Sequence, residues 1–113
     1  FPLFTVGWGW TSDYGSPDEP EMFNYLLGYS PYHNIKNTCY PPTMVTTGDT
    51  DDRVVPGHSF KFAAEMQYHQ TCDNPILIRI ETRAGHGKGT PMHLRIDQAA
   101  DTYSFLYKYL GME

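Results

Sequence analysis

The sequence is an acidic chain of 113 residues, with 13 Asp and Glu against 8 Lys and Arg and a formal net charge of −5. This charge disfavours nucleic acid as a partner, and no apolar run approaches the ~20 residues of a membrane-spanning helix, so we expect neither nucleic acid nor membrane as a partner. The chain begins at Phe1 and shows no signal-peptide pattern, which leads us to expect a piece of a longer protein.

The first third of the chain alternates turn signals with one short helix. Residues 4–20, FTVGWGWTSDYGSPDEP, are rich in aromatic residues and glycine and are predicted to be irregular. Asp18 is the expected N-cap of a helix that runs to Gly28, with an apolar stripe of Met22, Phe23, Leu26 and Leu27. Residues 29–42 contain three prolines and no sustained period, which predicts a loop.

The rest of the chain alternates strands and helices. Residues 43–48, TMVTTG, and residues 76–82, ILIRIET, are short apolar runs typical of strands. Residues 58–70 predict a helix between them, and an apolar stripe over residues 96–110 predicts a second helix, closed by Gly111. The order strand, helix, strand, helix predicts an α/β fold with parallel strands joined by a right-handed crossover.

The two cysteines, Cys39 and Cys72, are predicted to be free thiols. One precedes the first predicted strand and the other precedes the second, and no feature of the sequence positions them for a bridge. Reduced thiols favour the cytoplasm, with the periplasm or secretion as alternatives.

A charged loop follows each predicted strand. DTDDRVVPG, residues 49–57, follows the first strand, and RAGHGKGT, residues 83–90, follows the second. The carboxyl ends of parallel strands meet at one edge of an open α/β sheet, where ligands bind. We therefore expect Asp51 and His86 to lie close enough for a hydrogen bond.

An acid beside a histidine suits acyl-transfer chemistry. A neutral imidazole accepts the proton of an attacking hydroxyl when an acceptor holds its other nitrogen. In α/β-hydrolases the chain order is Ser, then Asp or Glu, then His, with the serine in a G-x-S-x-G turn. That turn is absent here, and no nucleophile is expected among the serines at positions 12, 16, 30, 59 and 104.

The acidic loop 49–52 also invites a calcium interpretation. An EF-hand loop needs glycine at its sixth position and glutamate at its twelfth, where this chain has Val54 and Phe60. We therefore expect no metal ion and no other cofactor.

Three segments, in one order along nearly the whole chain, carry a family resemblance. They are GWGWTSDYGSPDEPEMFNYLLGYSPYHNIK, TGDTDDRVVPGHSFKF and TRAGHGKGTP. Together they resemble the C-terminal end of the prolyl oligopeptidase family, serine peptidases that cleave short peptides after proline. The resemblance implies that residues 1–113 are the C-terminal portion of an α/β-hydrolase catalytic domain, whose nucleophile elbow and β-propeller lie outside the chain. By itself the chain is expected to be inactive.

The resemblance also assigns roles to individual residues. It implies that Asp51 is the acid and His86 the general base of a Ser-Asp-His triad. The implied substrate-binding residues are Trp10, Tyr14, Arg53 and Val54. Trp10 would stack on the substrate proline, a compact apolar ring, and Arg53 would bind the carbonyl before it. From the residues alone, Trp10 fits core packing as well, and Arg53 fits a surface ion pair with a neighbouring aspartate.

The implied partners are short proline-containing peptides and the remainder of the hydrolase domain with its β-propeller. A competing interpretation is a non-enzymatic module that binds peptide or carbohydrate by stacking. That module would need Trp8 and Trp10 exposed on one flat surface.

Overall fold

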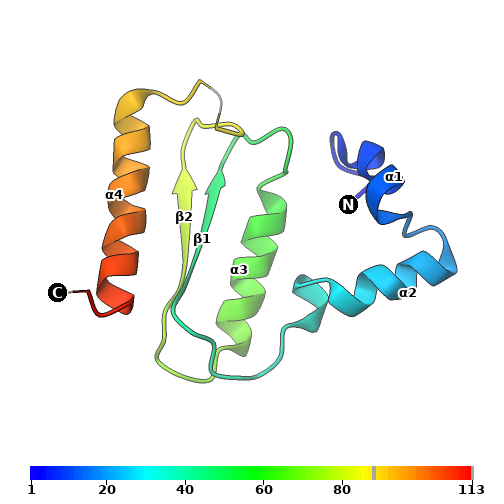
Figure 1. Cartoon of the computed structure of the whole chain (residues 1–113), viewed down its shortest axis with the longest axis horizontal. Helices are drawn as coiled ribbons and strands as arrows, with labels where there is room; N and C mark the ends of the chain where they lie inside the picture. The colour runs from blue at the N-terminus through cyan, green and yellow to red at the C-terminus, as the bar shows by residue number, and fades with distance from the viewer. Residues whose placement is uncertain (88, 113) are drawn as a thin grey trace.

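Two parallel strands form the centre of the fold (Figure 1). In the computed structural model, which describes residues 1–87 and 89–112, β1 spans Thr43–Gly48 and β2 spans Ile76–Glu81. The strands pair in register, from Thr43 beside Ile76 to Gly48 beside Glu81. Both predicted strands are confirmed, and the second is one residue shorter than expected. Their β-branched residues suit a pleated, half-buried surface.

The two longest helices lie on opposite sides of the strands in the view of Figure 1. α3, Gly57–His69, connects β1 to β2, and α4, Met92–Tyr109, follows β2. This order and the parallel pairing confirm the predicted α/β fold. A proline precedes the first residue of each helix, where its missing N–H costs no helical hydrogen bond. No helix in the described part of the chain is long and apolar enough to cross a membrane.

The N-terminal segment is more helical than predicted. It contains η1, Gly7–Trp10, then α1, Thr11–Tyr14, then α2, Pro20–Tyr29, and finally η2, Tyr32–Asn34. The predicted Asp18 cap is wrong, because Glu19 is the N-cap of α2 and no side chain caps this helix. The backbone N–H of Asp18 instead donates to the hydroxyl of Ser16 in the preceding turn. Pro20 then fills the first helical position, where proline is favoured.

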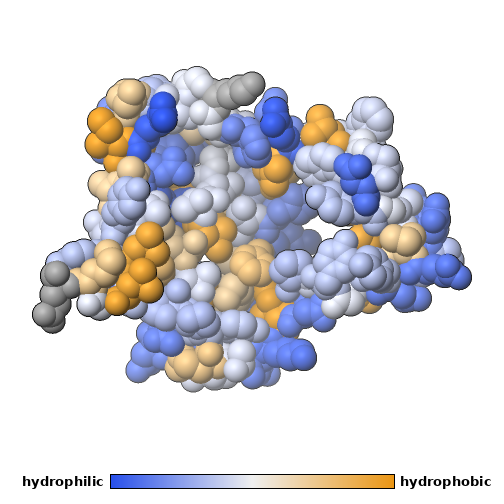
Figure 2. All heavy atoms as spheres, viewed as in Figure 1, coloured by the Kyte–Doolittle hydropathy of each residue, from blue (hydrophilic) through white to orange (hydrophobic). Residues whose placement is uncertain are grey.

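The described residues bury a small core. Four hydrophobic side chains are buried, namely Ala63, Met66, Ile76 and Ala84. Large apolar side chains such as Leu3, Trp8 and Leu110 are 91%, 70% and 68% exposed. Figure 2 shows hydrophobic residues gathered over α4. Apolar surface of this extent usually marks a region that another part of a protein covers.

The dimensions of the chain agree with this incomplete burial. The radius of gyration is 16.4 Å, whereas a compact chain of this length has a radius of about 13 Å. The accessible surface is 8192 Å², whereas a folded monomer of this mass exposes roughly 6300 Å². The chain therefore buries less surface than a self-contained domain of its size.

Cys39 and Cys72 form a disulfide, so the prediction of free thiols is wrong. Their Cα atoms lie 5.2 Å apart, within the usual range for a bridge. Cys39 precedes Thr43 and Cys72 precedes Ile76 by the same four residues, and these two strand residues are paired. The register of the sheet thus brings the cysteines together. Disulfides are rare in cytosolic proteins, which removes the basis of the cytoplasmic expectation.

Hydrogen bonds reinforce this end of the sheet. The Tyr40 backbone N–H donates to Gln70 Oε1 at 2.8 Å, and the Tyr40 carbonyl accepts from the side-chain amides of Gln70 and Asn74 at 3.1 and 3.0 Å. A parallel bridge also pairs Thr38 with Gln70. The disulfide therefore lies in an ordered network at the amino ends of both strands.

We predict that replacing both cysteines with serine destabilises the protein. The bridge closes a loop across a sequence separation of 33 residues, for which loop-closure entropy predicts a loss of about 3 to 4 kcal/mol in unfolding free energy. Denaturant unfolding of the purified protein measures the loss, and non-reducing peptide mapping should recover the two cysteine peptides linked. A reductant should destabilise the wild type but not the double variant. Alkylation of both thiols without reduction would contradict the bridge.

Gly48 allows the chain after β2 to cross the end of β1. A Cβ atom at this position would collide with the carbonyl oxygens of Ala84 and Gly85. Both are backbone atoms, so neither can rotate away. The crossing therefore requires glycine.

We predict that Gly48→Ala lowers the unfolding free energy by about 1 to 3 kcal/mol, the usual cost of overpacking. Gly28→Ala is the matched control, because Gly28 lies in α2 with open space around its Cβ position and alanine favours helix. Calorimetry should show a lower melting temperature for the first variant and an unchanged or higher one for the second. Equal melting temperatures would show that the crossing tolerates a side chain.

Candidate catalytic site

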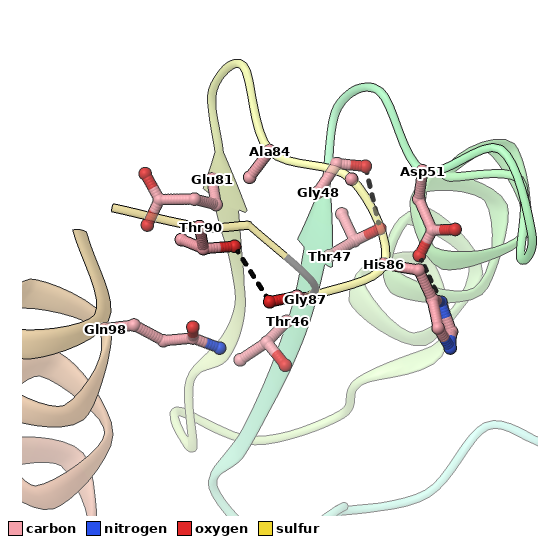
Figure 3. A pocket seen from close by; sticks show the side chains of 11 residues that line it. Thr46, Thr47, Gly48, Asp51, Glu81, Ala84, His86, Gly87, Thr90 and Gln98 are labelled. Carbon is pink, nitrogen blue, oxygen red and sulfur yellow. Dashed lines mark hydrogen bonds and ion pairs between the residues drawn. The ribbon is translucent and has the colours of Figure 1, made fainter. Parts of the chain in front are cut away.

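Asp51 and His86 meet at the carboxyl ends of the two strands (Figure 3). His86 Nδ1 lies 2.8 Å from Asp51 Oδ2. The expected hydrogen bond is present for the expected reason, because β1 and β2 run parallel and the loop after each strand leaves the same edge.

The turn that Asp51 begins also holds its carboxylate. Oδ1 accepts the backbone N–H groups of Arg53 and Val54, both at 2.9 Å, while Oδ2 faces His86. Burial raises the pKa of Asp51, but hydrogen bonds from Val54, His86 and Arg53, together with the charge of His86, bring it below its ordinary value. Asp51 is therefore ionised at neutral pH.

The ionised acid determines which nitrogen of His86 carries the proton. A carboxylate only accepts hydrogen bonds, so Nδ1 donates to Asp51 and Nε2 is left as the acceptor. The His86 side chain is 42% exposed, and within residues 1–87 and 89–112 no group makes a hydrogen bond to Nε2. This nitrogen is free to accept a hydrogen bond or a proton from a group that approaches it.

Among the described residues, the rings of two other histidines make hydrogen bonds, in a different pattern. The ring of His69 lies between an asparagine oxygen and Glu65 Oε1, at 2.6 and 3.1 Å, so both of its nitrogens are occupied. His33 Nδ1 lies 2.8 Å from Ser30 Oγ, and no described carboxylate holds that ring. In the described part of the chain, His86 alone combines a carboxylate on one nitrogen with an open second nitrogen.

A polar cleft of about 290 Å³ adjoins the acid and base. The ends of both strands and the His86 loop form its wall, and Glu81 and Gln98 lie across it from His86 (Figure 3). In the described ranges, no cluster of three or more histidine, cysteine or acidic side chains could hold a metal ion. The cleft thus offers a hydrogen-bonded base, and it can support proton transfer from a hydroxyl or a water molecule.

Trp10 and Tyr14 lie together, but in another cavity. This cavity is apolar, measures about 300 Å³ and is lined by Phe1, Trp10, Tyr14, Leu26, Tyr29, Ser30 and Pro31. Trp10 is half-buried there, and Tyr14 is 56% exposed. The structure therefore brings the two predicted pocket aromatics together without placing them in the cleft of Asp51 and His86.

Arg53 and Val54 are exposed residues of the Asp51 turn. The carbonyl of Arg53 accepts the hydroxyl of Thr5 at 2.9 Å, which ties the N-terminal segment to this turn. Among the described residues, the guanidinium of Arg53 makes no ion pair with a neighbouring aspartate. The surface-pair interpretation of Arg53 is therefore not observed.

Gly48 and Asp49 also contribute to this site, although neither was expected there from the sequence. Asp49 Oδ1 accepts the backbone N–H of Arg83 at the start of the His86 loop. A glycine at the last position of the predicted strand 43–48 was the available signal, because a glycine in a strand often marks a close approach of backbone.

Known proteins are similar to this chain in both amino-acid sequence and fold. The model of the prolyl oligopeptidase family, peptidase S9, matches residues 3–113. A prolyl endopeptidase of Elizabethkingia meningoseptica is 56% identical over 112 residues, which cover 97% of this chain and 16% of that protein. Prolyl oligopeptidase A of Amanita bisporigera is 48% identical over 99% of this chain and 15% of its own length.

The solved structures that resemble this chain include prolyl endopeptidases as well. A chain from a structural study of two prolyl endopeptidases superposes with a TM-score of 0.93 at 38% identity, covering 98% of this chain and 16% of that one. The chain thus spans about a sixth of the length of the relatives it matches, and its fold corresponds to part of their α/β-hydrolase domain. Because the family model matches residues 3–113 and the relatives share much of the sequence and the fold, the chain belongs to the prolyl oligopeptidase family.

Proposed function

We propose that this chain is the C-terminal portion of a serine peptidase that cleaves short peptides after proline. In this proposal Asp51 and His86 supply the acid and the general base of a Ser-Asp-His triad. The serine, its oxyanion donors and the β-propeller belong to parts of the protein outside these 113 residues. Family membership and the names of the relatives support the reaction class.

The hydrogen bond between Asp51 and His86 carries the proposal. A base for acyl transfer needs an imidazole whose tautomer is fixed and whose second nitrogen is open. Asp51 fixes the tautomer through its 2.8 Å hydrogen bond, and its lowered pKa keeps it ionised while His86 gains a proton. Nε2 then receives the proton of the serine hydroxyl and returns it to the leaving amine.

The apolar surface of the chain supports its place in a larger domain. Large apolar side chains are exposed along α4, including Ile96, Tyr103 and Tyr107. The accessible surface exceeds that of a compact protein of this size, so the chain lacks part of its packing. The remainder of the hydrolase domain, with its propeller, is the partner that we propose for this surface.

The proposed substrate pocket rests on the family motif. Trp10 and Tyr14 offer flat aromatic faces in an apolar cavity, which suits a proline ring. Val54 is 38% exposed in the Asp51 turn. Arg53 is exposed on that turn and can donate to the carbonyl of the residue before the scissile proline.

The competing stacking module fits the structure less well. It requires two tryptophans side by side on one open surface. Trp8 is 70% exposed, whereas Trp10 is half-buried in the wall of a cavity. We therefore retain the peptidase as the proposed function.

We predict that His86→Ala abolishes turnover of a chromogenic Gly-Pro substrate by the complete protein while leaving it folded. Asp51→Asn should lower kcat by roughly 10³- to 10⁴-fold, because an amide does not hold the imidazole in the required tautomer. Steady-state kinetics measure both effects, and circular dichroism checks the fold. His93→Ala is the matched control, since His93 lies in α4 and lines neither the cleft of Asp51 and His86 nor the apolar cavity of Trp10.

The 113-residue chain alone should give no measurable hydrolysis, because without the serine His86 has no nucleophilic hydroxyl to activate. Near-normal rates after His86→Ala in the complete protein would rule out the assigned base. A loss of equal size in the His93→Ala control would show that the assay reports folding rather than catalysis.

We also predict that Trp10→Ala weakens the preference for proline over alanine at the cleaved position by roughly 3- to 10-fold, the worth of one aromatic contact. Ratios of kcat/KM for paired substrates measure the preference. Trp8→Ala should leave the ratio unchanged because Trp8 is largely exposed outside the cavity. An unchanged ratio for Trp10→Ala, or equal losses in both variants, would contradict the proposed pocket.

A further inference from the structure

We infer that Asp49 is a positioning residue for His86, because its side chain holds the backbone turn that starts the His86 loop. The inference rests on the proposed function and adds a residue to it. Asp49 Oδ1 accepts the backbone N–H of Arg83 at 2.6 Å, across a sequence separation of 34 residues. Asp49 follows Gly48 directly at the end of β1, and Arg83 lies two residues beyond the end of β2.

Arg83 has a backbone conformation that needs external support. Its φ is 62°, in the left-handed region that residues with a Cβ rarely adopt. A non-glycine residue there is strained, and the surrounding structure must hold it in place. The hydrogen bond from its N–H to Asp49 supplies such a constraint at the strained residue itself.

Two backbone hydrogen bonds also hold the turn at Arg83. The N–H of Asp49 donates to the Glu81 carbonyl at 3.0 Å, and the N–H of Thr50 donates to the Ala84 carbonyl at 3.2 Å. Gly48 permits the close approach of Ala84, whose side chain is buried. The chain is therefore fixed on both sides of Arg83, at Glu81 and at Ala84, and Ala84 lies two residues before His86.

Asp51 and Asp49 hold different parts of the chain that position His86. Asp51 holds the imidazole ring through Nδ1, and Asp49 holds the backbone from which that ring projects. Without the Asp49 acceptor, Arg83 can relax towards negative φ, and the Cα of His86 then moves relative to Asp51. Small displacements of a catalytic group lower the rate far more than they lower stability.

The test uses the complete protein and a set of variants at two positions. Asp49→Ala removes the acceptor, whereas Asp49→Asn keeps an oxygen that can accept the Arg83 N–H. Arg83→Gly removes the cost of a positive φ, so it should compensate for the loss of the acceptor in the double variant D49A/R83G. Asp52→Ala is the control, because the Asp52 side chain is exposed and makes no hydrogen bond or ion pair among the described residues.

Each rate is divided by the concentration of active sites, titrated with an irreversible serine-directed inhibitor, so that misfolded protein does not count. Asp49→Ala should lower kcat by roughly 10- to 100-fold, with KM changed by less than about threefold. Asp49→Asn and D49A/R83G should each recover most of the loss, and Asp52→Ala should match the wild type. A residue that supports only the overall fold would change the number of active sites instead.

A kcat for Asp49→Ala close to that of the wild type would overturn the inference. Failure of both Asp49→Asn and Arg83→Gly to restore kcat would also overturn it, since neither the acceptor nor the strained turn would then matter. If Asp49→Ala does not fold, D49A/R83G decides alone, and low activity per site in that variant refutes the role. Failure of the proposed function itself gives another result: either the wild-type protein is inactive, or His86→Ala leaves its activity unchanged.

Discussion

The register of β1 against β2 determines what lies at each end of the sheet. Thr43 pairs with Ile76 and Gly48 pairs with Glu81, so residues at similar distances from the two strands become neighbours. At the amino ends this pairing joins Cys39 to Cys72. At the carboxyl ends it joins Asp51 to His86. A shift of one residue would turn each side chain of a strand to the opposite face and separate both pairs.

The positions of Asp51 and His86 are set by local hydrogen bonds. A chain with a small core can therefore keep the two side chains together. Asp51 is fixed by two N–H groups of its own turn, and the His86 loop is held by groups at the end of β1. None of these contacts requires the large apolar surface that the chain leaves exposed. In the proposed complete protein, the missing parts therefore add a nucleophile to an acid–base pair that is already arranged.

Much of this arrangement is predictable from the sequence, because it follows from periodicity and from the topology of parallel strands. The strands, the helices between and after them, and the meeting of Asp51 with His86 all follow from that reasoning. The disulfide does not, since the equal offset of both cysteines from the strands gains meaning only once the register is known.

Other features depend on contacts that no periodic pattern encodes. Asp49 looks like one more charge in an acidic loop until the backbone of Arg83 is placed beside it. The aromatic residues of the N-terminal segment are recognisable as a group, but their separate cavity follows from the packing of that segment against α2. The short helices η1 and α1 form over residues that lack a helical period, and the intrinsic propensities of those residues give little warning of them.

In the proposed function, His86 accepts the proton of a serine supplied by another part of the same protein. A crystal structure of the complete protein with a transition-state analogue bound covalently to its reactive serine would test this pairing. We expect Nε2 of His86 to lie within about 2.6 to 3.2 Å of that serine's Oγ, with Nδ1 still bonded to Asp51. A different histidine against the serine, or a His86 ring turned away from it, would rule out this role for His86.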